Sequence, residues 1–415
     1  MASKNVTLPV QPEANIGTIG HVDHGKTTLV RALSGVWAAK HSEELRRGIT
    51  IKLGYADAPI YKCPKCNEPD CYTTSPTCTA CGSKCEFQRA VSFVDAPGHE
   101  ALMATMLSGA AVMDGAILVI AADEHCPQPQ TREHLAALEV VGIKKIIIVQ
   151  NKIDIVGEKR ILENYEEITD FVKGTIAKDA PIIPVSAQHS VNIDVLIKAM
   201  QDHIPTPKRD VTKPPFMYII RSFDINKPGT SIKDLAGGVI GGSIIHGKFK
   251  LDDEIQICPG VRVEKQGKST FQPLHTKIVS LRAGGRNVDE VQSGGLVGIG
   301  TMLDPSLAKA DSLTGNLAGL PEKLPPTVSE VTMTTHFFER AVGTKELIAV
   351  DRVLPNENLL LDVGTTITTG KVSSVRGDIA TVGLNRSVCV EKGMRAALSR
   401  RMASRWRLIG YGIVE

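Results

Sequence analysis

The sequence has no long apolar run. No stretch of its 415 residues approaches the roughly 20 consecutive apolar residues that a helix needs to span a bilayer. The N-terminal stretch MASKNVTLPVQPEAN contains no apolar core of the kind that a signal peptide carries, so we do not expect secretion. Solenoid-type repeats and low-complexity segments are also absent from the sequence.

The sequence also has no strong excess of charge of one sign. Lys and Arg number 48 against 45 Asp and Glu, which leaves a formal net charge of +3. Any surface for nucleic acid must therefore be a local patch and not a global field. The length and the 42% hydrophobic content are typical of a globular protein of two to four domains of roughly 100–200 residues.

The cysteines are clustered. The chain has nine, and six of them lie between Cys63 and Cys85. An odd total that is grouped into CxxC pairs argues against a disulfide framework and indicates a metal in a reducing, cytoplasmic environment. We expect the other three to be small buried side chains: Cys126, Cys258 and Cys389.

Two CxxC knuckles lie eleven residues apart and favour a structural Zn²⁺ with four thiolate ligands. The predicted ligands are Cys63, Cys66, Cys78 and Cys81. The additional Cys71 and Cys85 leave the ligand set open, because either of them could replace one of these four. A redox dithiol and an iron–sulfur cluster are the alternative interpretations of the same pattern.

The order of predicted elements indicates three domains. The first 200 residues alternate Ile/Val-rich strands with helices, as in a doubly wound α/β sheet covered on both faces. The proline-rich stretch IPTPKRDVTKPP (204–215) cannot be a helix and reads as a linker, and GLPEKLPP (319–326) reads as a second boundary. Glycines between short β-rich runs predict small β-barrels after the linker. We therefore expect an α/β domain at 1–206 with a zinc knuckle at about 61–87, and barrels at 207–326 and 327–415.

A phosphate-binding loop stands between the first predicted strand and helix. In GHVDHGKTTL (20–29), Gly20 and Gly25 allow backbone N–H groups to turn inward at a helix N-terminus, where an anion is stabilised. Lys26 is placed to reach the β- and γ-phosphates, and the Thr27 hydroxyl to bind Mg²⁺. The predicted nucleotide-binding residues of this loop are Asp23, His24, Gly25, Lys26, Thr27 and Thr28.

Two later motifs predict that the base is guanine. NKID (151–154) follows an apolar strand, so it lies at a strand's carboxyl end, where open α/β sheets bind ligands. The Asp154 carboxylate suits the two N–H donors of guanine, which adenine lacks. Asn151 and Lys152 would fix the loop and cover the base, and SAQ would aim N–H groups at guanine O6 through Ser186, Ala187 and Gln188.

The motif DAPGH (95–99) fits a sensor of the γ-phosphate. Asp95 would hold Mg²⁺ through water, and Gly98 would present its N–H to the γ-phosphate. His99 is the predicted catalytic residue, because it is placed to orient the attacking water. The reaction implied is hydrolysis of GTP to GDP and phosphate, in which the protein supplies alignment and charge neutralisation.

A second switch segment is RRGIT (46–50). Thr50 is the natural second hydroxyl ligand of Mg²⁺, and Gly48 allows close backbone approach. Asp23 in the phosphate loop completes the predicted Mg²⁺ set. Arg46 and Arg47 are expected to face solvent or a partner, so no catalytic arginine is assigned.

Taken together, these motifs resemble the translational GTPases of the elongation factor Tu group. HSEELRRGITIKLGYA with a zinc knuckle just after it, MATMLSGAAVMDGAILVIAA, RSFDINKPGT, GGLVGIGTMLDPSLAKAD and SRWRLIGYG are similar to the gamma subunits of archaeal and eukaryotic translation initiation factor 2. The HVDHGKT core favours the archaeal form. This resemblance covers nearly the whole chain.

The resemblance implies a heterotrimer with alpha and beta subunits, the alpha subunit docking on the second domain and beta on the first. It also implies GTP-dependent binding of methionyl initiator tRNA and its delivery to the small ribosomal subunit. Alternatives are a selenocysteine-tRNA elongation factor, a sulfate-activation GTPase subunit, and a zinc-dependent nucleic-acid adaptor without GTP turnover.

The densest basic stretch, SRRMASRWRL, leaves two interpretations open. It is either a solvated strand with alternating arginines or a phosphate-contacting patch. The residues concerned are Arg400, Arg401, Arg405 and Arg407 around Trp406.

Overall fold

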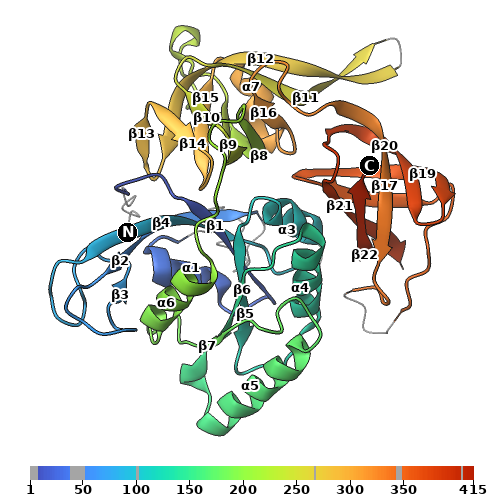
Figure 1. Ribbon diagram of the computed structural model, residues 1–415. Coiled ribbons are helices and arrows are strands. Elements are labelled where there is room, and N and C mark those ends of the chain that lie inside the picture. Colours follow the sequence, from blue (N-terminus) through green and yellow to red (C-terminus); the bar gives the residue numbers. More distant parts are fainter. Residues whose placement is uncertain (1–7, 38–51, 100–101, 266–267, 343–347, 403–404) are drawn as a thin grey trace. The chain divides into compact units, whose positions relative to one another are not determined.

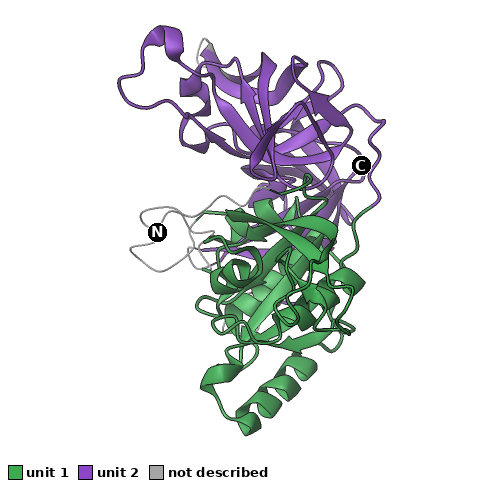
Figure 2. Cartoon of the chain, turned by 90° about the vertical axis from the view of Figure 1, so that its left-hand side faces the viewer, with its two compact units in different colours: residues 1–207 green, residues 208–415 purple. Residues whose placement is uncertain are grey.

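The computed structural model describes residues 8–37, 52–99, 102–265, 268–342, 348–402 and 405–415 (Figure 1). The chain forms two compact units, residues 1–207 and 208–415, which Figure 2 shows in different colours. Residues 204–215 at their junction contain no helix or strand. No helix among the described residues is both long and apolar enough to cross a membrane.

The first unit is built on a seven-stranded sheet with the order β3-β2-β4-β1-β5-β6-β7. The strands from β4 to β7 pair in parallel, and β2 and β3 are antiparallel additions at one edge. The strands are β1 (Ala14–Gly20), β2 (Gly54–Lys62), β3 (Tyr72–Thr73), β4 (Glu86–Asp95), β5 (Gly115–Ala121), β6 (Ile146–Asn151) and β7 (Ile182–Pro184).

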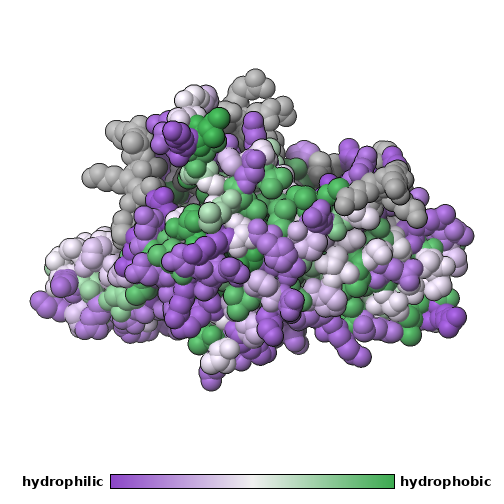
Figure 3. All heavy atoms as spheres, turned by 90° about the horizontal axis from the view of Figure 1, so that it is seen from above, coloured by the Kyte–Doolittle hydropathy of each residue, from purple (hydrophilic) through white to green (hydrophobic). Residues whose placement is uncertain are grey.

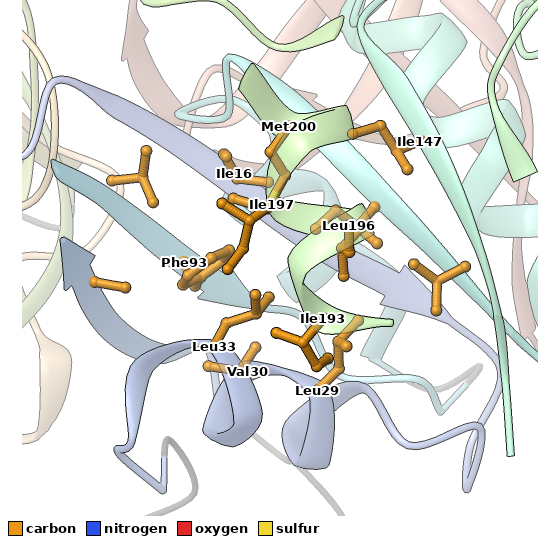
Figure 4. Packing of buried hydrophobic residues seen from close by; sticks show 14 of the residues in the cluster. Ile16, Leu29, Val30, Leu33, Phe93, Ile147, Ile193, Leu196, Ile197 and Met200 are labelled. Atoms are coloured by element: carbon orange, nitrogen blue, oxygen red, sulfur yellow. The ribbon is translucent and has the colours of Figure 1, made fainter. Parts of the chain in front are cut away.

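Helices cover both faces of this sheet, which is why β1 and β5 are buried along their whole length. On one face, α1 and α6 pack Leu29, Leu33 and Leu196 against Ile16 and Phe93 (Figure 4). The helices are α1 (Lys26–Ser34), α3 (Met103–Ala110), α4 (Pro129–Val141), α5 (Glu158–Val172) and α6 (Ile193–His203), with a 3₁₀ turn η2 (Ile153–Ile155).

The second unit begins with a closed β-barrel. Its strand order is β11-β16-β8-β9-β15-β12, and pairing of β11 with β12 completes the ring around an Ile-rich core. The strands are β8 (Phe216–Phe223), β9 (Val239–His246), β11 (Glu254–Lys265), β12 (Lys268–Ala283), β15 (Val297–Thr301) and β16 (Leu317–Gly319). Short additions are β10 (Lys248–Lys250), β13 (Arg286–Val288), β14 (Glu290–Gln292), η3 (Ile232–Asp234), α7 (Pro305–Ala308) and η4 (Lys309–Asp311).

A second closed barrel follows in the same unit, with the order β17-β20-β19-β18-β21-β22. Its strands are β17 (Thr327–Phe337), β18 (Asn358–Val363), β19 (Thr366–Arg376), β20 (Ile379–Cys389), β21 (Arg395–Met402) and β22 (Arg405–Val414). The two barrels share a small hydrophobic cluster that includes Phe216, Leu317 and Cys389.

The predicted fold class, a doubly wound α/β domain followed by two β-barrels, is confirmed. The ranges 1–206, 207–326 and 327–415 stay predictions. Cys126, Cys258 and Cys389 are buried, as expected of small packing side chains.

Candidate functional site

The phosphate loop joins the carboxyl end of β1 to the first turn of α1. Asp23 and Gly25 both have positive φ angles, 60° and 87°, and Gly25 is the residue immediately before the helix. A Cβ on Gly25 would lie 2.3 Å from the side-chain amide nitrogen of Asn151, so only glycine fits at this position. The loop is therefore held in a left-handed turn that points main-chain N–H groups inward.

Lys26 lies inside this loop. Its Nζ donates a hydrogen bond of 2.5 Å to the carbonyl oxygen of His21. Burial lowers the pKa of Lys26 to about 8, against the pull of Asp95 and Asp23 in the other direction. A Cβ on Gly98 would approach Lys26 Nζ to 2.6 Å, so the main chain of the DAPGH segment lies directly against the ammonium group. The two predicted phosphate-sensing residues are thus brought together.

The predicted Mg²⁺ ligands Thr27 and Asp95 are in contact. The Thr27 hydroxyl donates to Asp95 Oδ2 at 2.6 Å, and the Thr18 hydroxyl donates to Oδ1 at 3.0 Å. Asp95 is completely buried at the end of β4. A hydroxyl and a carboxylate are the hard oxygen ligands that Mg²⁺ prefers, so this pair fits the ion. Thr50 and Gly48 lie outside the described residues, as do Arg46 and Arg47.

The base-recognition segments meet at the ends of β6 and β7. Asn151 donates to the carbonyl oxygen of His24 at 2.9 Å and accepts from the N–H of Ala187 at 3.0 Å. One buried side chain therefore ties the phosphate loop, NKID and SAQ into a single structure. The carboxylate of Asp154 lies 3.6 Å from His189 Nε2, and a hydrogen bond with Ser186 is the main cause that lowers its pKa.

The remaining predicted residues differ in their surroundings. Lys152 has a φ of 64° and reaches Asp123 Oδ2 at 3.2 Å. Thr28 lies in the first turn of α1, Gln188 is exposed after β7, and His99 is exposed in the loop after β4. The role of His99 as the water-orienting residue stays a prediction.

The imidazole of His24 is turned inward. It is buried, with Nδ1 at 3.1 Å from the Val119 carbonyl oxygen and Nε2 at 3.4 Å from Glu124 Oε2. Burial lowers its pKa to about 4, so it is neutral near pH 7. The ring supports the phosphate loop from behind, and the proposed nucleotide contact falls to the main chain of His24.

Sequence reasoning missed His134 on α4. Its Nδ1 accepts a hydrogen bond of 2.9 Å from the N–H of Gly20, the first residue of the phosphate loop. Burial lowers the pKa of His134 to about 3, which keeps the ring neutral and available as an acceptor. A polar side chain on the buried face of TREHLAAL was the only signal for it in the sequence.

The cysteine knuckle forms as predicted. The sulfurs of Cys63, Cys66, Cys78 and Cys81 lie within 4.8 Å of one another. The Cys63–Cys81 and Cys66–Cys78 Sγ distances are 3.5 and 3.7 Å. Tetrahedral Zn²⁺ with Zn–S bonds of ~2.3 Å separates its sulfurs by about 3.8 Å, so the cluster fits zinc.

Cys71 and Cys85 support the knuckle through their main chains. The N–H of Cys63 donates to the carbonyl oxygen of Cys71 at 2.8 Å. The N–H of Cys85 donates to the carbonyl oxygen of Pro76 at 2.9 Å. Both residues are buried, and neither belongs to the group of four converging sulfurs. The geometry therefore favours the ligand set predicted first.

Of the basic stretch in β21 and β22, Arg400 is engaged inside the second barrel. Its guanidinium contacts Glu357, with Nε 2.5 Å from Oε1 and Nη2 3.2 Å from Oε2. Arg401 and Arg405 are exposed. Arg400 is thus part of the barrel's own structure.

Comparisons with known proteins identify families and relatives of this chain. Residues 11–206 match the family Elongation factor Tu GTP binding domain, and residues 329–414 match Initiation factor eIF2 gamma, C terminal. The chain is 61% identical over 405 residues to translation initiation factor 2 subunit gamma of Methanothermobacter thermautotrophicus, covering 98% of this chain and 99% of that one. The corresponding protein of Methanocaldococcus jannaschii is 60% identical, with 98% of both chains covered.

The chain belongs to the translation initiation factor 2 gamma subunit family. A bacterial selenocysteine-specific elongation factor shares its fold, with a TM-score of 0.74 at 24% identity over 97% of this chain and 58% of the other. Elongation factor SelB from Methanococcus maripaludis, solved with a GTP analogue, gives 0.72 at 22% identity over 98% of this chain and 79% of the other. The selenocysteine alternative is therefore only a distant structural neighbour, and the chain is a translational GTPase of initiation.

Proposed function

We propose that this chain is the GTP-hydrolysing gamma subunit of a heterotrimeric initiation factor that carries methionyl initiator tRNA to the small ribosomal subunit. One observation carries the nucleotide part: Asn151 joins the phosphate loop to the two base-recognition segments by hydrogen bonds of 2.9 and 3.0 Å. This junction supports a single pocket for a base and its phosphates. The domain ranges 1–206, 207–326 and 327–415 are part of the same proposal.

In this pocket, the main-chain N–H groups of the phosphate loop and Lys26 bind the phosphates. The Asp154 carboxylate accepts hydrogen bonds from guanine, Lys152 covers the base, and Ser186, Ala187 and Gln188 present N–H groups to guanine O6. A site that demands these hydrogen bonds rejects adenine because a charged carboxylate would lose its partners.

The Thr27–Asp95 pair would hold Mg²⁺, together with Asp23, Gly48 and Thr50. When bound, the ion neutralises charge on the β- and γ-phosphates. Gly98 would present its N–H to the γ-phosphate, and His99 would orient the water that attacks it. Loss of the γ-phosphate then releases the segments that contain Thr50 and Gly98, which gives the protein two states. The reaction, hydrolysis of GTP to GDP and phosphate, is that of the protein-synthesising GTPases.

Zn²⁺ in the knuckle would have a structural role, because four thiolates leave no open coordination position. Hydrogen bonds from Ser83 lower the pKa of Cys81 to about 6, which favours its thiolate. Two salt bridges to Glu68 join the knuckle to the sheet domain. Lys62 lies 2.8 Å from its carboxylate, and Lys198 on α6 lies 3.4 Å from it.

The first barrel offers a surface for the alpha subunit. Ile225 and Ile232 are 56% and 87% exposed on the segment after β8, and Met302 is 68% exposed beside it. Asn226 holds this segment in shape by accepting from the Ala236 N–H and donating to its carbonyl oxygen, both at 2.8 Å. Figure 3 shows hydrophobic atoms exposed among hydrophilic ones on one face of the chain. We assign the alpha subunit to the first barrel, the beta subunit to the nucleotide domain, and the site of action to the cytoplasm.

The test is retention of tRNA on filters by the chain assembled with its alpha and beta subunits. Methionyl initiator tRNA and elongator methionyl tRNA are compared with GTP and with GDP, and Asp154→Asn provides a matched variant with impaired guanine binding. We expect strong retention of the initiator with GTP only. Equal retention of the two tRNAs, or retention that ignores the nucleotide, would contradict the proposal.

A further inference from the structure

The loop that follows β5, residues 122–126, touches both halves of the nucleotide site. Asp123 Oδ2 lies 3.2 Å from Nζ of Lys152 in the base-recognition segment. The next residue, Glu124, places Oε2 at 3.4 Å from Nε2 of His24 in the phosphate loop. The main-chain N–H of Ala122 donates to the carbonyl oxygen of Asn151 at 2.8 Å. Movement of this loop would therefore displace the base and phosphate contacts together.

Helix α5 holds the main chain of the same loop. Arg160 donates from Nε to the Ala122 carbonyl oxygen at 3.1 Å and from Nη2 to that of Glu124 at 2.8 Å. Asn164 Nδ2 donates to the Glu124 carbonyl oxygen as well, at 3.0 Å. The Glu167 carboxylate accepts from the Cys126 N–H at 2.8 Å. Three main-chain groups of the loop, the carbonyls of Ala122 and Glu124 and the N–H of Cys126, are thus held by four hydrogen bonds from one helix.

Arg160 and Glu167 are also bound to each other. Nη1 and Nη2 of Arg160 donate to Oε1 and Oε2 of Glu167 at 2.8 and 3.1 Å, a paired geometry that fixes both side chains. Burial alone would raise the pKa of Glu167, but hydrogen bonds from Arg160, the Cys126 N–H and His125 outweigh it and lower the pKa to about 2. Residues 160, 164 and 167 follow the i, i+4, i+7 spacing of one helix face.

The N-terminal half of α5 has no fully buried apolar side chain, and Ile161 there is half-buried. The buried residues of α5 are Asn164, Ile168 and Val172, so the apolar ones lie in its C-terminal half. Its N-terminal half is joined to the sheet through the polar network, which includes Gln150 beside Asn151. Gln150 Nε2 donates to the Ile161 carbonyl oxygen at 2.8 Å and to Asn164 Oδ1 at 3.0 Å.

We propose that Arg160 and Glu167 are positioning residues for the guanine nucleotide site. Their paired side chains hold loop 122–126, and the loop holds Lys152 and His24 in the arrangement that binds base and phosphates. Among the contacts described, neither residue touches the phosphate loop, NKID or SAQ directly. The inference rests on the proposed function of the pocket.

The test is the dissociation rate of fluorescent N-methylanthraniloyl GDP from the full chain in stopped-flow experiments. Glu167→Gln keeps the size of the side chain but puts an amide donor among N–H donors. We expect dissociation to accelerate ~3- to 30-fold, the range typical of coupled positions outside a site. Asp170→Asn is the matched control on the same helix, because its carboxylate contacts only the exposed Lys173 among the contacts described, at 2.6 Å. It should leave the rate within twofold of wild type.

A purely structural role is distinguished by a double-mutant cycle with Asp123→Asn. Because Glu167 acts through the loop, its substitution should have a smaller effect on the rate once the Asp123–Lys152 contact is gone. Additive effects, or a wild-type rate in a folded Glu167→Gln chain, would overturn the inference. Arg160→Lys, which keeps the charge but loses the paired geometry, should accelerate dissociation too and replaces Glu167→Gln if that chain does not fold. A wild-type chain that does not bind GDP would contradict the pocket itself, and this inference with it.

Discussion

We expect the protein to take up protons from solution when it binds a nucleotide, because the Lys26 side chain becomes protonated. Burial holds its pKa at about 8, whereas the ordinary value is 10.5. In the empty site, roughly a tenth of the Lys26 side chains are then neutral at pH 7, about half at pH 8 and roughly three quarters at pH 8.5. The phosphates of a bound nucleotide restore the charged form, so GDP binding should take up about 0.1, 0.5 and 0.75 protons at these pH values.

The same titration weakens affinity. Because only the protonated lysine binds phosphate well, GDP should bind roughly fourfold more weakly at pH 8.5 than at pH 7. The stability of the nucleotide-free chain should change in the opposite direction, since the unfolded state binds more protons than the folded state between pH 8 and 10.5. His24 and His134 remain neutral throughout this window, because burial lowers their pKa values to about 4 and about 3.

The assay is titration calorimetry of GDP in two buffers of different ionisation enthalpy at each pH, which gives the number of protons taken up. A matched series with the His134→Asn variant checks that the protons are taken up by Lys26 and not by the neighbouring imidazole of His134. Proton uptake of zero at pH 8, with an affinity that stays constant from pH 7 to 8.5, would refute the reasoning.

Three more results are expected. Asp154→Asn should weaken GDP binding by about 100-fold or more and improve binding of xanthosine diphosphate, whose 2-oxo group accepts from the new amide; competition calorimetry measures both, and unchanged base preference would count against the assignment. Wild-type chain should contain one zinc by elemental analysis, and Cys66→Ser or a strong chelator should remove it and lower the melting temperature by several degrees, whereas a chain that is stable and zinc-free would argue for another role of the knuckle. His134→Ala leaves the Gly20 N–H without its acceptor, so urea unfolding should show a loss of ~1–3 kcal/mol and GDP should bind more weakly; equal stability would show that the loop does not need this bond.

The sequence predicted those parts of the site that are encoded in short contiguous motifs. A strand, a glycine turn and a helix start fall within ten residues around Lys26, and NKID and DAPGH each follow an apolar run. Their common location follows from parallel strands, whose carboxyl ends meet at one edge of a sheet. The same local logic predicted the cysteine knuckle.

Contacts between distant residues were beyond this reasoning. Gly20 and His134 are 114 positions apart, and His24 and Glu124 are 100 apart, so no periodicity connects them. The nucleotide contact of His24 stays a prediction, and its place in the loop did not indicate that its ring turns toward Val119 and Glu124. The sequence likewise did not decide which four of the six cysteines are the predicted zinc ligands. The folded chain brings four sulfurs together, whereas Cys71 and Cys85 support the knuckle through main-chain hydrogen bonds.

The closure of the barrels was equally a matter of long-range pairing. Glycine spacing predicted short strands, but the ring of the first barrel is completed by β11 and β12 and that of the second by β17 and β22. Strand order is set by pairings between segments that are distant in the sequence. A single sequence therefore does not contain it as a local signal.

The central claim is that one pocket holds guanine and a magnesium-bound triphosphate. Calorimetric titration of the full chain with a non-hydrolysable GTP analogue and with the corresponding ATP analogue, each with and without Mg²⁺, tests it most directly. The account predicts binding of the guanine analogue that strengthens with Mg²⁺ and no measurable binding of the adenine analogue. Equal affinity for the two bases would contradict it.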